Sequence, residues 1–223
     1  RETGLLNNLD LKITQVTAVK SIIEDIFPEH LDCPQTCPRF VGRIIRDVDL
    51  SVPSPLWLQE KLRRSGIRSI DSVVDVTNFV MLELNQPMHA YDLDRLDGGI
   101  TVRLSKRGEQ MTLLDGSSVE LLEDTTLITD KSGPVGMAGI MGGDRTAVST
   151  ETKNIFLEAA FFTPLGVAGK ARSYGMHTDA CHRFERGVDY HGQVDAIERA
   201  SALLLSIGGG KAGPTVDVSD QAQ

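Results

Sequence analysis

The sequence predicts an α+β fold, with mixed and antiparallel sheets packed against helices. Three observations lead to this class. β-forming residues dominate the runs 40–48, 100–104 and 155–162. Helical periodicity is concentrated in the segments 54–66, 71–84 and 189–207. Strands and helices follow one another in irregular order, unlike the strict alternation of a doubly wound parallel sheet.

The first part of the chain contains two well-marked helices. Residues 14–26 have only weak helical periodicity, and we expect a helix there to end before Pro28. The next helix begins at Ser54–Pro55, a cap residue followed by proline, and ends at Gly66. The segment 71–84 carries an apolar stripe at helical spacing, so a second helix is predicted. Residues 88–92 follow Pro87, and we interpret them as a loop beside the end of this helix.

From Gly99 the periodicity changes from helical to alternating. Strands are predicted over 100–104, 125–129 and 135–141, a hairpin over 111–122 and a closing strand over 215–218. The glycines of the segment 136–143 do not match a phosphate-binding loop, because the lysine of that motif is absent. Glycine at a strand end also lets backbone N–H groups approach a ligand, and such a cradle and a plain packing role both remain open.

The stretch 154–187 contains the most informative residues. Its first part, 155–162, is an apolar strand with one carboxylate, Glu158, in the middle. A buried carboxylate must be paired, protonated or turned to a polar pocket, while a strand-edge glutamate would simply face solvent. Both positions remain open from this run alone. A short helix is predicted over 163–174, followed by a polar segment over 177–187 that indicates one wall of a binding site.

This polar stretch has a local excess of positive charge. Between residues 165 and 187 the cations are Lys170, Arg172, Arg183 and Arg186, and the anions are Asp179 and Glu185. The whole chain has a net charge of −8, which argues against broad, non-specific nucleic-acid binding. A local basic mouth that accepts one end of a nucleic acid remains compatible with that charge.

Length and composition argue against a membrane protein, a disulfide-rich protein and a zinc-binding protein. The chain has 223 residues, begins at Arg1 and contains no apolar run long enough for a membrane span, and we interpret it as a fragment of a longer protein. Its cysteine usage favours a reducing, cytoplasmic compartment. The odd number of cysteines argues against a disulfide framework, and Cys33 and Cys37 lack a second pair at zinc-site spacing. No metal site is predicted. We divide the chain into a lead-in segment from a neighbouring domain, 1–36, and one domain, 37–223.

Four motifs occur in order: QPMHA at 86–90, GIMGG at 139–143, LEAAFF at 157–162 and HTDACHRFERG at 177–187. Together they resemble the B3/B4 editing region of the β subunit of bacterial phenylalanyl-tRNA synthetase. The resemblance covers about residues 37–220. It implies the B3/B4 fold and hydrolysis of tyrosine mischarged onto phenylalanine tRNA.

The resemblance also implies roles for individual residues. It implies a catalytic site of His89, Glu158 and Thr178, in which Glu158 recognises the tyrosine hydroxyl and His89 lines the hydrolytic centre. Thr178 and Ala180 are expected to shape the wall, and Gly142 to permit close backbone approach. Contacts to the aminoacyl-adenosine end are expected from Arg68, Thr77 and Asn78.

Partners and cofactors follow from the same resemblance. The expected partners are the acceptor end of phenylalanine tRNA, the synthetase α subunit and the remaining β-subunit domains. No cofactor is expected in this fragment, and ATP and Mg²⁺ are expected only in the whole synthetase.

Recognition of tyrosine requires a specific acceptor. Because tyrosine is larger than phenylalanine, a pocket cannot admit the first and exclude the second by size, so it must bind the hydroxyl. A hydrogen bond to a charged group contributes about 1.5–3 kcal/mol, and phenylalanine would leave the acceptor unpaired. Two alternatives remain. One is a non-catalytic module that binds the tRNA acceptor end, or serves as a scaffold of the synthetase, through Arg172, Arg183 and Arg186. The other is a general hydrolase that pairs Glu158 with Asp92 or Asp179.

Overall fold

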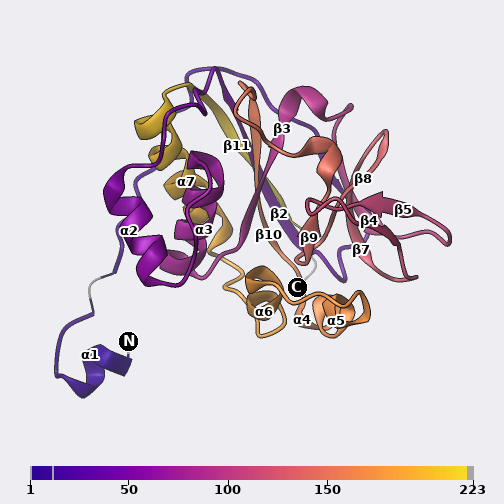
Figure 1. Ribbon diagram of the computed structural model, residues 1–223, viewed down its shortest axis with the longest axis horizontal. Helices are drawn as coiled ribbons and strands as arrows, with labels where there is room; N and C mark the ends of the chain where they lie inside the picture. The colour runs from indigo at the N-terminus through magenta and orange to yellow at the C-terminus, as the bar shows by residue number, and fades with distance from the viewer. Residues whose placement is uncertain (1, 12, 220–223) are drawn as a thin grey trace.

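Strand β10 (Ile155–Phe161) is an inner strand of a four-stranded antiparallel sheet with the order β11–β2–β10–β3. The computed structural model describes residues 2–11 and 13–219. In the four-stranded sheet, β10 pairs with β2 (Arg39–Arg46) and β3 (Met88–Asp92), and β11 (Lys211–Ser219) covers the other edge of β2. Figure 1 shows this sheet between a group of helices and a second sheet.

Three helices cover one face of the four-stranded sheet. They are α2 (Leu56–Arg64), α3 (Ser72–Leu84) and α7 (Gln193–Gly208). Their apolar residues pack against Val41, Ile45, Ile155, Leu157 and Ala159 of the sheet. Strand alternation places the next residues of β10, including Glu158, on the opposite face.

The opposite face packs against a five-stranded sheet with the order β1–β4–β7–β8–β9. Its strands are β1 (Glu29–Leu31), β4 (Ile100–Leu104), β7 (Thr126–Asp130), β8 (Gly133–Met137) and β9 (Met141–Gly142). Only the β1–β4 pair is parallel among the described pairs. The predicted α+β class, with mixed and antiparallel sheets and packed helices, is confirmed.

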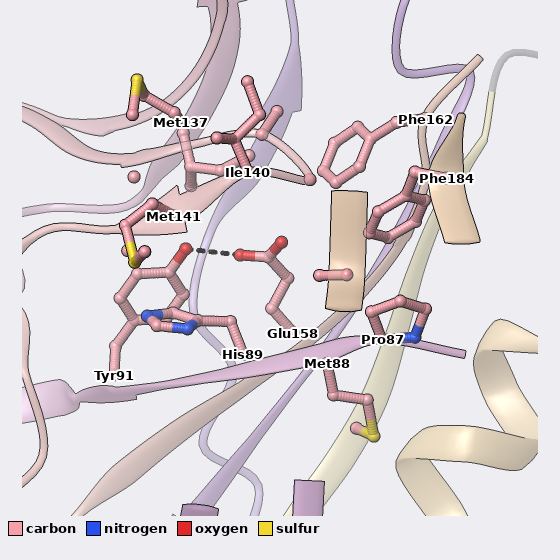
Figure 2. Close-up of a pocket in the computed structure, with 16 residues that line it drawn as sticks. Pro87, Met88, His89, Tyr91, Met137, Ile140, Met141, Glu158, Phe162 and Phe184 are labelled. Atoms are coloured by element: carbon pink, nitrogen blue, oxygen red, sulfur yellow. Dashed lines mark hydrogen bonds between the residues drawn. The ribbon is translucent and has the colours of Figure 1, made fainter. Parts of the chain in front are cut away.

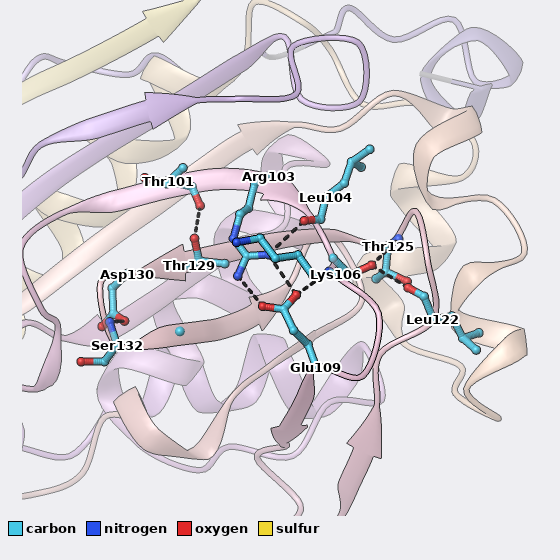
Figure 3. Close-up of polar contacts among 12 residues, drawn as sticks. Thr101, Arg103, Leu104, Lys106, Glu109, Leu122, Thr125, Thr129, Asp130 and Ser132 are labelled. Carbon is cyan, nitrogen blue, oxygen red and sulfur yellow. Dashed lines mark hydrogen bonds and ion pairs between the residues drawn. The ribbon is translucent and has the colours of Figure 1, made fainter.

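The β5–β6 hairpin (Gln110–Thr112 and Ser118–Glu120) is attached to the five-stranded sheet by polar contacts. Arg103 and Glu109 form an ion pair at 2.6 Å (Figure 3). The Ser105 hydroxyl donates to the Leu122 carbonyl at 2.6 Å. Beyond β5, the Leu114 N–H donates to the Gly142 carbonyl at 3.2 Å. The hairpin therefore supports the strand that carries Gly142.

The smaller elements of the described residues include α1 (Glu2–Leu6), the short 3₁₀ helices η1 (Leu93–Arg95) and η2 (Asp144–Thr146), and the helices α4 (Pro164–Val167) and α5 (Lys170–Ser173). A further helix, α6 (Asp179–Phe184), lies beside α4 and α5 at one end of the molecule (Figure 1).

Several sequence predictions need correction. Residues 88–92 are not a loop but strand β3, because they pair along β10. The helix predicted over 163–174 is two short helices, separated at Gly169, whose φ is +77°. Residues 14–26 form no helix, and strand 135–141 is divided into β8 and β9 by a turn in which Gly139 has φ +69°.

Other boundaries differ by a few residues. Helix α2 begins at Leu56 with Pro55 at its cap position, and α7 begins at Gln193 rather than at residue 189.

The end of the predicted lead-in segment is built into this domain. Strand β1 pairs with β4, and Cys33 is buried in the core between the two sheets. Earlier in the segment, the backbone of Val19 contacts a buried ion pair, in which Arg43 lies 2.8 Å from Glu198. The Arg43 guanidinium donates to the Val19 carbonyl, and the Val19 N–H donates to the Glu198 carboxylate. The assignment of residues 1–36 to a neighbouring domain remains a prediction.

Candidate functional site

A cavity opens between the two sheets at the end where α6 packs. Strands β3 and β10 form one side, and the turn joining β8 to β9 forms another (Figure 2). The lining is mainly apolar, with one carboxylate and one imidazole. Its residues are Pro87, Met88, His89, Tyr91, Ile128, Gly136, Met137, Ala138, Gly139, Ile140, Met141, Gly142, Glu158, Phe162, Ala180 and Phe184.

Glu158 is buried on the cavity side of β10, with 6% of its surface exposed. The alternative in which it faces solvent at a strand edge is therefore wrong. One carboxylate oxygen, Oε2, accepts a hydrogen bond from the Tyr91 hydroxyl at 2.5 Å. Burial raises the pKa of Glu158 to about 7, and the Tyr91 hydrogen bond opposes this rise. The carboxyl group therefore titrates near neutral pH.

His89 lies directly opposite Glu158 in the register of β3 and β10. Its ring packs edge-on against Tyr91, with 4.5 Å between the ring centroids. Burial lowers the pKa of His89 to about 4, so the imidazole is neutral at pH 7. Its Nε2 atom is buried and has no hydrogen-bond partner among residues 2–11 and 13–219. It is a polar atom available to a bound substrate or water.

Gly142 lies close to the His89 ring. A Cβ at position 142 would lie 2.5 Å from His89 Cε1, so no side chain fits there while the ring keeps its position. Gly139 has a similar restriction, since a Cβ would lie 2.9 Å from Phe184 Cδ2 and φ is +69°. Glycine is therefore required for packing at both positions, and the backbone reaches the cavity directly at Gly142.

Helix α6 carries the wall opposite the strands. Its cap residue is Thr178, whose Oγ1 accepts from the Cys181 N–H and donates to the Ile140 carbonyl, both at 3.1 Å. Ala180 lines the cavity, but Thr178 does not. Thr178 therefore connects α6 to the β8–β9 turn. It makes no contact with the cavity that would support its predicted direct role in catalysis.

Three predicted substrate contacts are not brought to the cavity. Arg68, Thr77 and Asn78 do not line it. Arg68 follows α2, and Thr77 and Asn78 lie on α3, which packs against the other face of the four-stranded sheet. The Thr77 hydroxyl donates to the Val74 carbonyl of its own helix at 3.0 Å. Their contact with the aminoacyl-adenosine end remains a prediction.

The pairing of Glu158 with a second acid gains no support. Asp92 accepts from the Thr152 hydroxyl at 2.7 Å, and strand alternation places it on the other face of β3 from His89 and Tyr91. Asp179 pairs with Arg183 at 2.9 Å and is exposed. Neither residue lines the cavity.

Sequence reasoning missed Tyr91, which has 1% of its surface exposed and the closest polar contact to Glu158. The alternation of His89 and Tyr91 in 88–92 is the signal that could have identified it, because strand residues two apart share a face. Gln86 was also missed as a support: its amide donates to the Ala160 carbonyl at 2.9 Å and accepts from Gln193 at 3.0 Å. These bonds fix Pro87 at the cavity.

The described residues, 2–11 and 13–219, show neither a metal site nor a membrane-spanning helix. No group of three or more His, Cys, Asp or Glu side chains in these ranges is arranged to hold a metal ion. Within the same ranges, every helix is too short or too polar to cross a membrane.

Comparison with known proteins identifies the family. The B3/4 domain model matches residues 36–209. The phenylalanine–tRNA ligase β subunit of Hahella chejuensis is 56% identical over 98% of this chain, and that of Yersinia pestis is 52% identical over 100% of it. The chain spans 28% of the length of each of these two relatives.

A solved structure shows the same fold. An N-terminal fragment of the phenylalanyl-tRNA synthetase β subunit from Pyrococcus horikoshii matches with a TM-score of 0.56 and 14% identity, over 93% of this chain and 57% of that one. The predicted resemblance is confirmed: the chain belongs to the B3/4 domain family, in common with the B3/4 region of phenylalanine–tRNA ligase β subunits.

Proposed function

We propose that this domain is an editing hydrolase that removes tyrosine from mischarged phenylalanine tRNA. The observation that carries the proposal is Glu158, a buried carboxylate in an otherwise apolar cavity that also contains His89. An apolar cavity accommodates an aromatic ring, and the carboxylate offers an acceptor for a phenolic hydroxyl.

The carboxylate provides the discrimination. Tyrosine donates its hydroxyl to Glu158, whereas phenylalanine buries the carboxylate against an apolar ring edge and gives no hydrogen bond in return. Sites that bind a hydroxyl can reject the analogue without it by factors of about 10⁴–10⁵. Correctly charged phenylalanyl-tRNA is therefore spared.

Hydrolysis of the activated ester requires a positioned water and stabilisation of the developing oxyanion. A neutral His89 is a weak base, so we assign it the orientation of that water through Nε2 rather than strong proton abstraction. The backbone at Gly142 is the candidate for the oxyanion contact, because it reaches the cavity without a side chain.

The test is deacylation of tyrosyl-tRNA and phenylalanyl-tRNA by the complete ligase and by a Glu158→Ala variant. The variant is expected to lose its preference for the tyrosyl substrate. Unchanged rate and selectivity would show that Glu158 does not recognise tyrosine. Glu120→Ala is a matched control, since it removes an exposed carboxylate from the β5–β6 hairpin.

The expected partners are phenylalanine tRNA, the synthetase α subunit and the rest of the β subunit. The relatives are named as phenylalanine–tRNA ligase β subunits, which supports the tRNA and the rest of the β subunit as partners. ATP and Mg²⁺ would act in aminoacylation elsewhere in such an enzyme. The expected compartment is the cytoplasm.

A second candidate is non-catalytic binding of the tRNA acceptor end. It is favoured by a separate surface pocket beside α6 that includes Arg172, Arg186, His177 and His182. Arg183, the third predicted cation, forms an ion pair with Asp179 at 2.9 Å. Turnover of mischarged tRNA separates the candidates, because a binding module would retain the tRNA and release no tyrosine.

A further inference from the structure

Tyr91 is the closest polar neighbour of the proposed tyrosine-recognition group. Its hydroxyl donates to Glu158 Oε2 at 2.5 Å, and its ring packs against those of His89 and Phe156, with centroid distances of 4.5 Å and 6.2 Å. Figure 2 shows the hydroxyl and the carboxylate pointing toward each other inside the cavity. A phenol of the protein thus already contacts the carboxylate in the way proposed for the phenol of the substrate.

The bond to Tyr91 uses one of the two carboxylate oxygens. Within residues 2–11 and 13–219, no hydrogen bond is made by the other oxygen, Oε1, and Glu158 lines the cavity. An ionised carboxylate has about four acceptor positions, so a substrate hydroxyl can bind while Tyr91 remains bound. Tyr91 therefore fixes the orientation of the carboxylate and leaves acceptor positions on Oε1 for a substrate hydroxyl.

The other groups around Glu158 give it no positive charge. His89 on β3 is neutral at pH 7, since burial lowers its pKa to about 4. Glu29 on β1 and Cys37 before β2 are acidic groups whose own pKa values are raised by burial and by Glu158. The cavity-lining residues of β8, β9 and α6 are glycines and apolar side chains. Among the described residues, Tyr91 is thus the hydrogen-bond donor to the Glu158 carboxyl group.

We propose that Tyr91 is a specificity-determining positioning residue, whose hydroxyl keeps Glu158 an oriented, ionised acceptor for the phenol of the substrate. This inference rests on the proposed function, because it assigns Tyr91 a role through Glu158. The hydrogen bond opposes the rise in the Glu158 pKa that burial causes, which is the effect a phenol donor should have on a buried carboxylate.

A protonated Glu158 accepts a weaker hydrogen bond from the substrate hydroxyl than an ionised one. A neutral hydrogen bond is roughly half as strong as one to a charged group. Without the Tyr91 hydroxyl, a larger share of Glu158 would be protonated at pH 7, and selectivity for tyrosine over phenylalanine would fall. Higher pH would ionise the carboxyl again and restore part of that selectivity.

The experiment measures the ratio of kcat/KM for tyrosyl-tRNA and phenylalanyl-tRNA hydrolysis by the complete ligase between pH 6 and pH 8.5. The uncatalysed rate is subtracted at each pH. The enzymes compared are the parent, Tyr91→Phe, Glu158→Gln, the double variant and Tyr174→Phe. Tyr174 is a matched control, because its hydroxyl also makes a hydrogen bond, to Thr125 at 2.7 Å, outside the cavity.

Tyr91→Phe is expected to lower selectivity about tenfold at pH 7, equivalent to about 1.4 kcal/mol, with recovery toward pH 8.5. Tyr174→Phe is expected to keep the parent profile. With Gln at position 158 the selectivity should no longer vary with pH, and adding Tyr91→Phe should leave that flat profile flat.

Two outcomes would overturn the inference. One is a parent-like pH profile in Tyr91→Phe, and the other is a loss of equal size at every pH, which indicates a structural role only. The proposed function fails in a different way, when Glu158→Gln keeps the selectivity of the parent. Loss of selectivity in Glu158→Gln with an unchanged Tyr91→Phe profile rejects only the role of Tyr91.

Discussion

Glu158 on β10 and His89 on β3 lie directly opposite each other on neighbouring strands, although they are 69 positions apart in the sequence. Their side chains share the cavity face of the sheet because the two strands are paired in this register. A shift of one residue would turn one of them toward the helices. The relative position of the Glu158 carboxyl group and the His89 imidazole is therefore set by the sheet.

His89 should act as a neutral group at physiological pH. Its pKa is lowered to about 4 by burial, so protonation begins well below the ordinary value near 6.5. In a Glu158→Gln background, which removes the titration of the other cavity group, kcat for hydrolysis is expected to stay constant from pH 6 to 8. Its acid limb should appear only near pH 4. An acid limb near pH 6.5 would show instead that the imidazole is accessible to water.

Gly142→Ala should impair hydrolysis by displacing His89, since the added Cβ would lie 2.5 Å from His89 Cε1. A misplacement of about 1 Å can cost about 100-fold in rate, and a fall of that order in kcat is expected. Gly192→Ala is the matched control, because its Cβ meets no atom closer than 3.6 Å. Full activity in Gly142→Ala would mean that His89 moves without consequence.

Secondary-structure elements could be predicted from the sequence where the signal for them lies within a single segment. Helix α3 has an apolar stripe and a capping residue, Asp71, whose carboxylate accepts from the N–H groups of Val73 and Val74. Both signals can be read within one segment, and the helix was predicted correctly. Strand β3 has five residues and depends on pairing with β10. Its stabilisation is non-local, which explains why it was interpreted as a loop.

The same distinction applies to the cavity. The resemblance and the buried carboxylate indicated Glu158, His89, Gly142 and Ala180, and all four line the cavity. Tyr91 was missed because its role depends on the face that it shares with His89 in β3. Arg68 and the α3 residues are outside the cavity lining, and no periodic pattern in one segment reveals how a helix lies relative to a distant pocket.

Glu29 should make stability depend on pH. Both of its carboxylate oxygens are buried without a hydrogen-bond partner in the described part of the chain. Burial, followed by the charges of Glu158 and Asp217, raises the pKa of Glu29 to about 9 from an ordinary 4.5. The folded state therefore keeps a proton that the unfolded state loses above pH 4.5. The stability contribution is complete below pH 4.5 and is lost as pH rises toward 9.

Glu29→Gln removes this titration while keeping the shape of the neutral acid. The variant should be more stable than the parent at pH 8 and similar to it at pH 4.5, as measured by urea unfolding at each pH. Glu120→Gln, which changes an exposed carboxylate, controls for the change in net charge. A parent and a Glu29→Gln variant with the same pH dependence would show that Glu29 finds a partner or water in solution.

Thr178 should matter through its two hydrogen bonds rather than through contact with the substrate. It caps α6 through the Cys181 N–H and connects that helix to the β8–β9 turn through the Ile140 carbonyl. Loss of such a cap costs about 0.5–2 kcal/mol. Thr178→Ala should therefore loosen the wall that carries Ala180 and lower hydrolysis, whereas Thr178→Ser keeps the hydroxyl and should restore it. Hydrogen exchange at the Cys181 amide measures the loosening directly.

Thr163→Ala is the control that separates the effect of a capping hydrogen bond from the effect of replacing a threonine at a cap position. Thr163 occupies the cap position of α4 but makes no capping hydrogen bond there, so its replacement should leave amide exchange in its helix almost unchanged. If Thr178→Ser behaves like Thr178→Ala, the methyl group rather than the hydroxyl supports the wall. If Thr178→Ala loses hydrolysis while Cys181 exchange stays at the parent rate, Thr178 acts on the reaction itself, as the resemblance first implied.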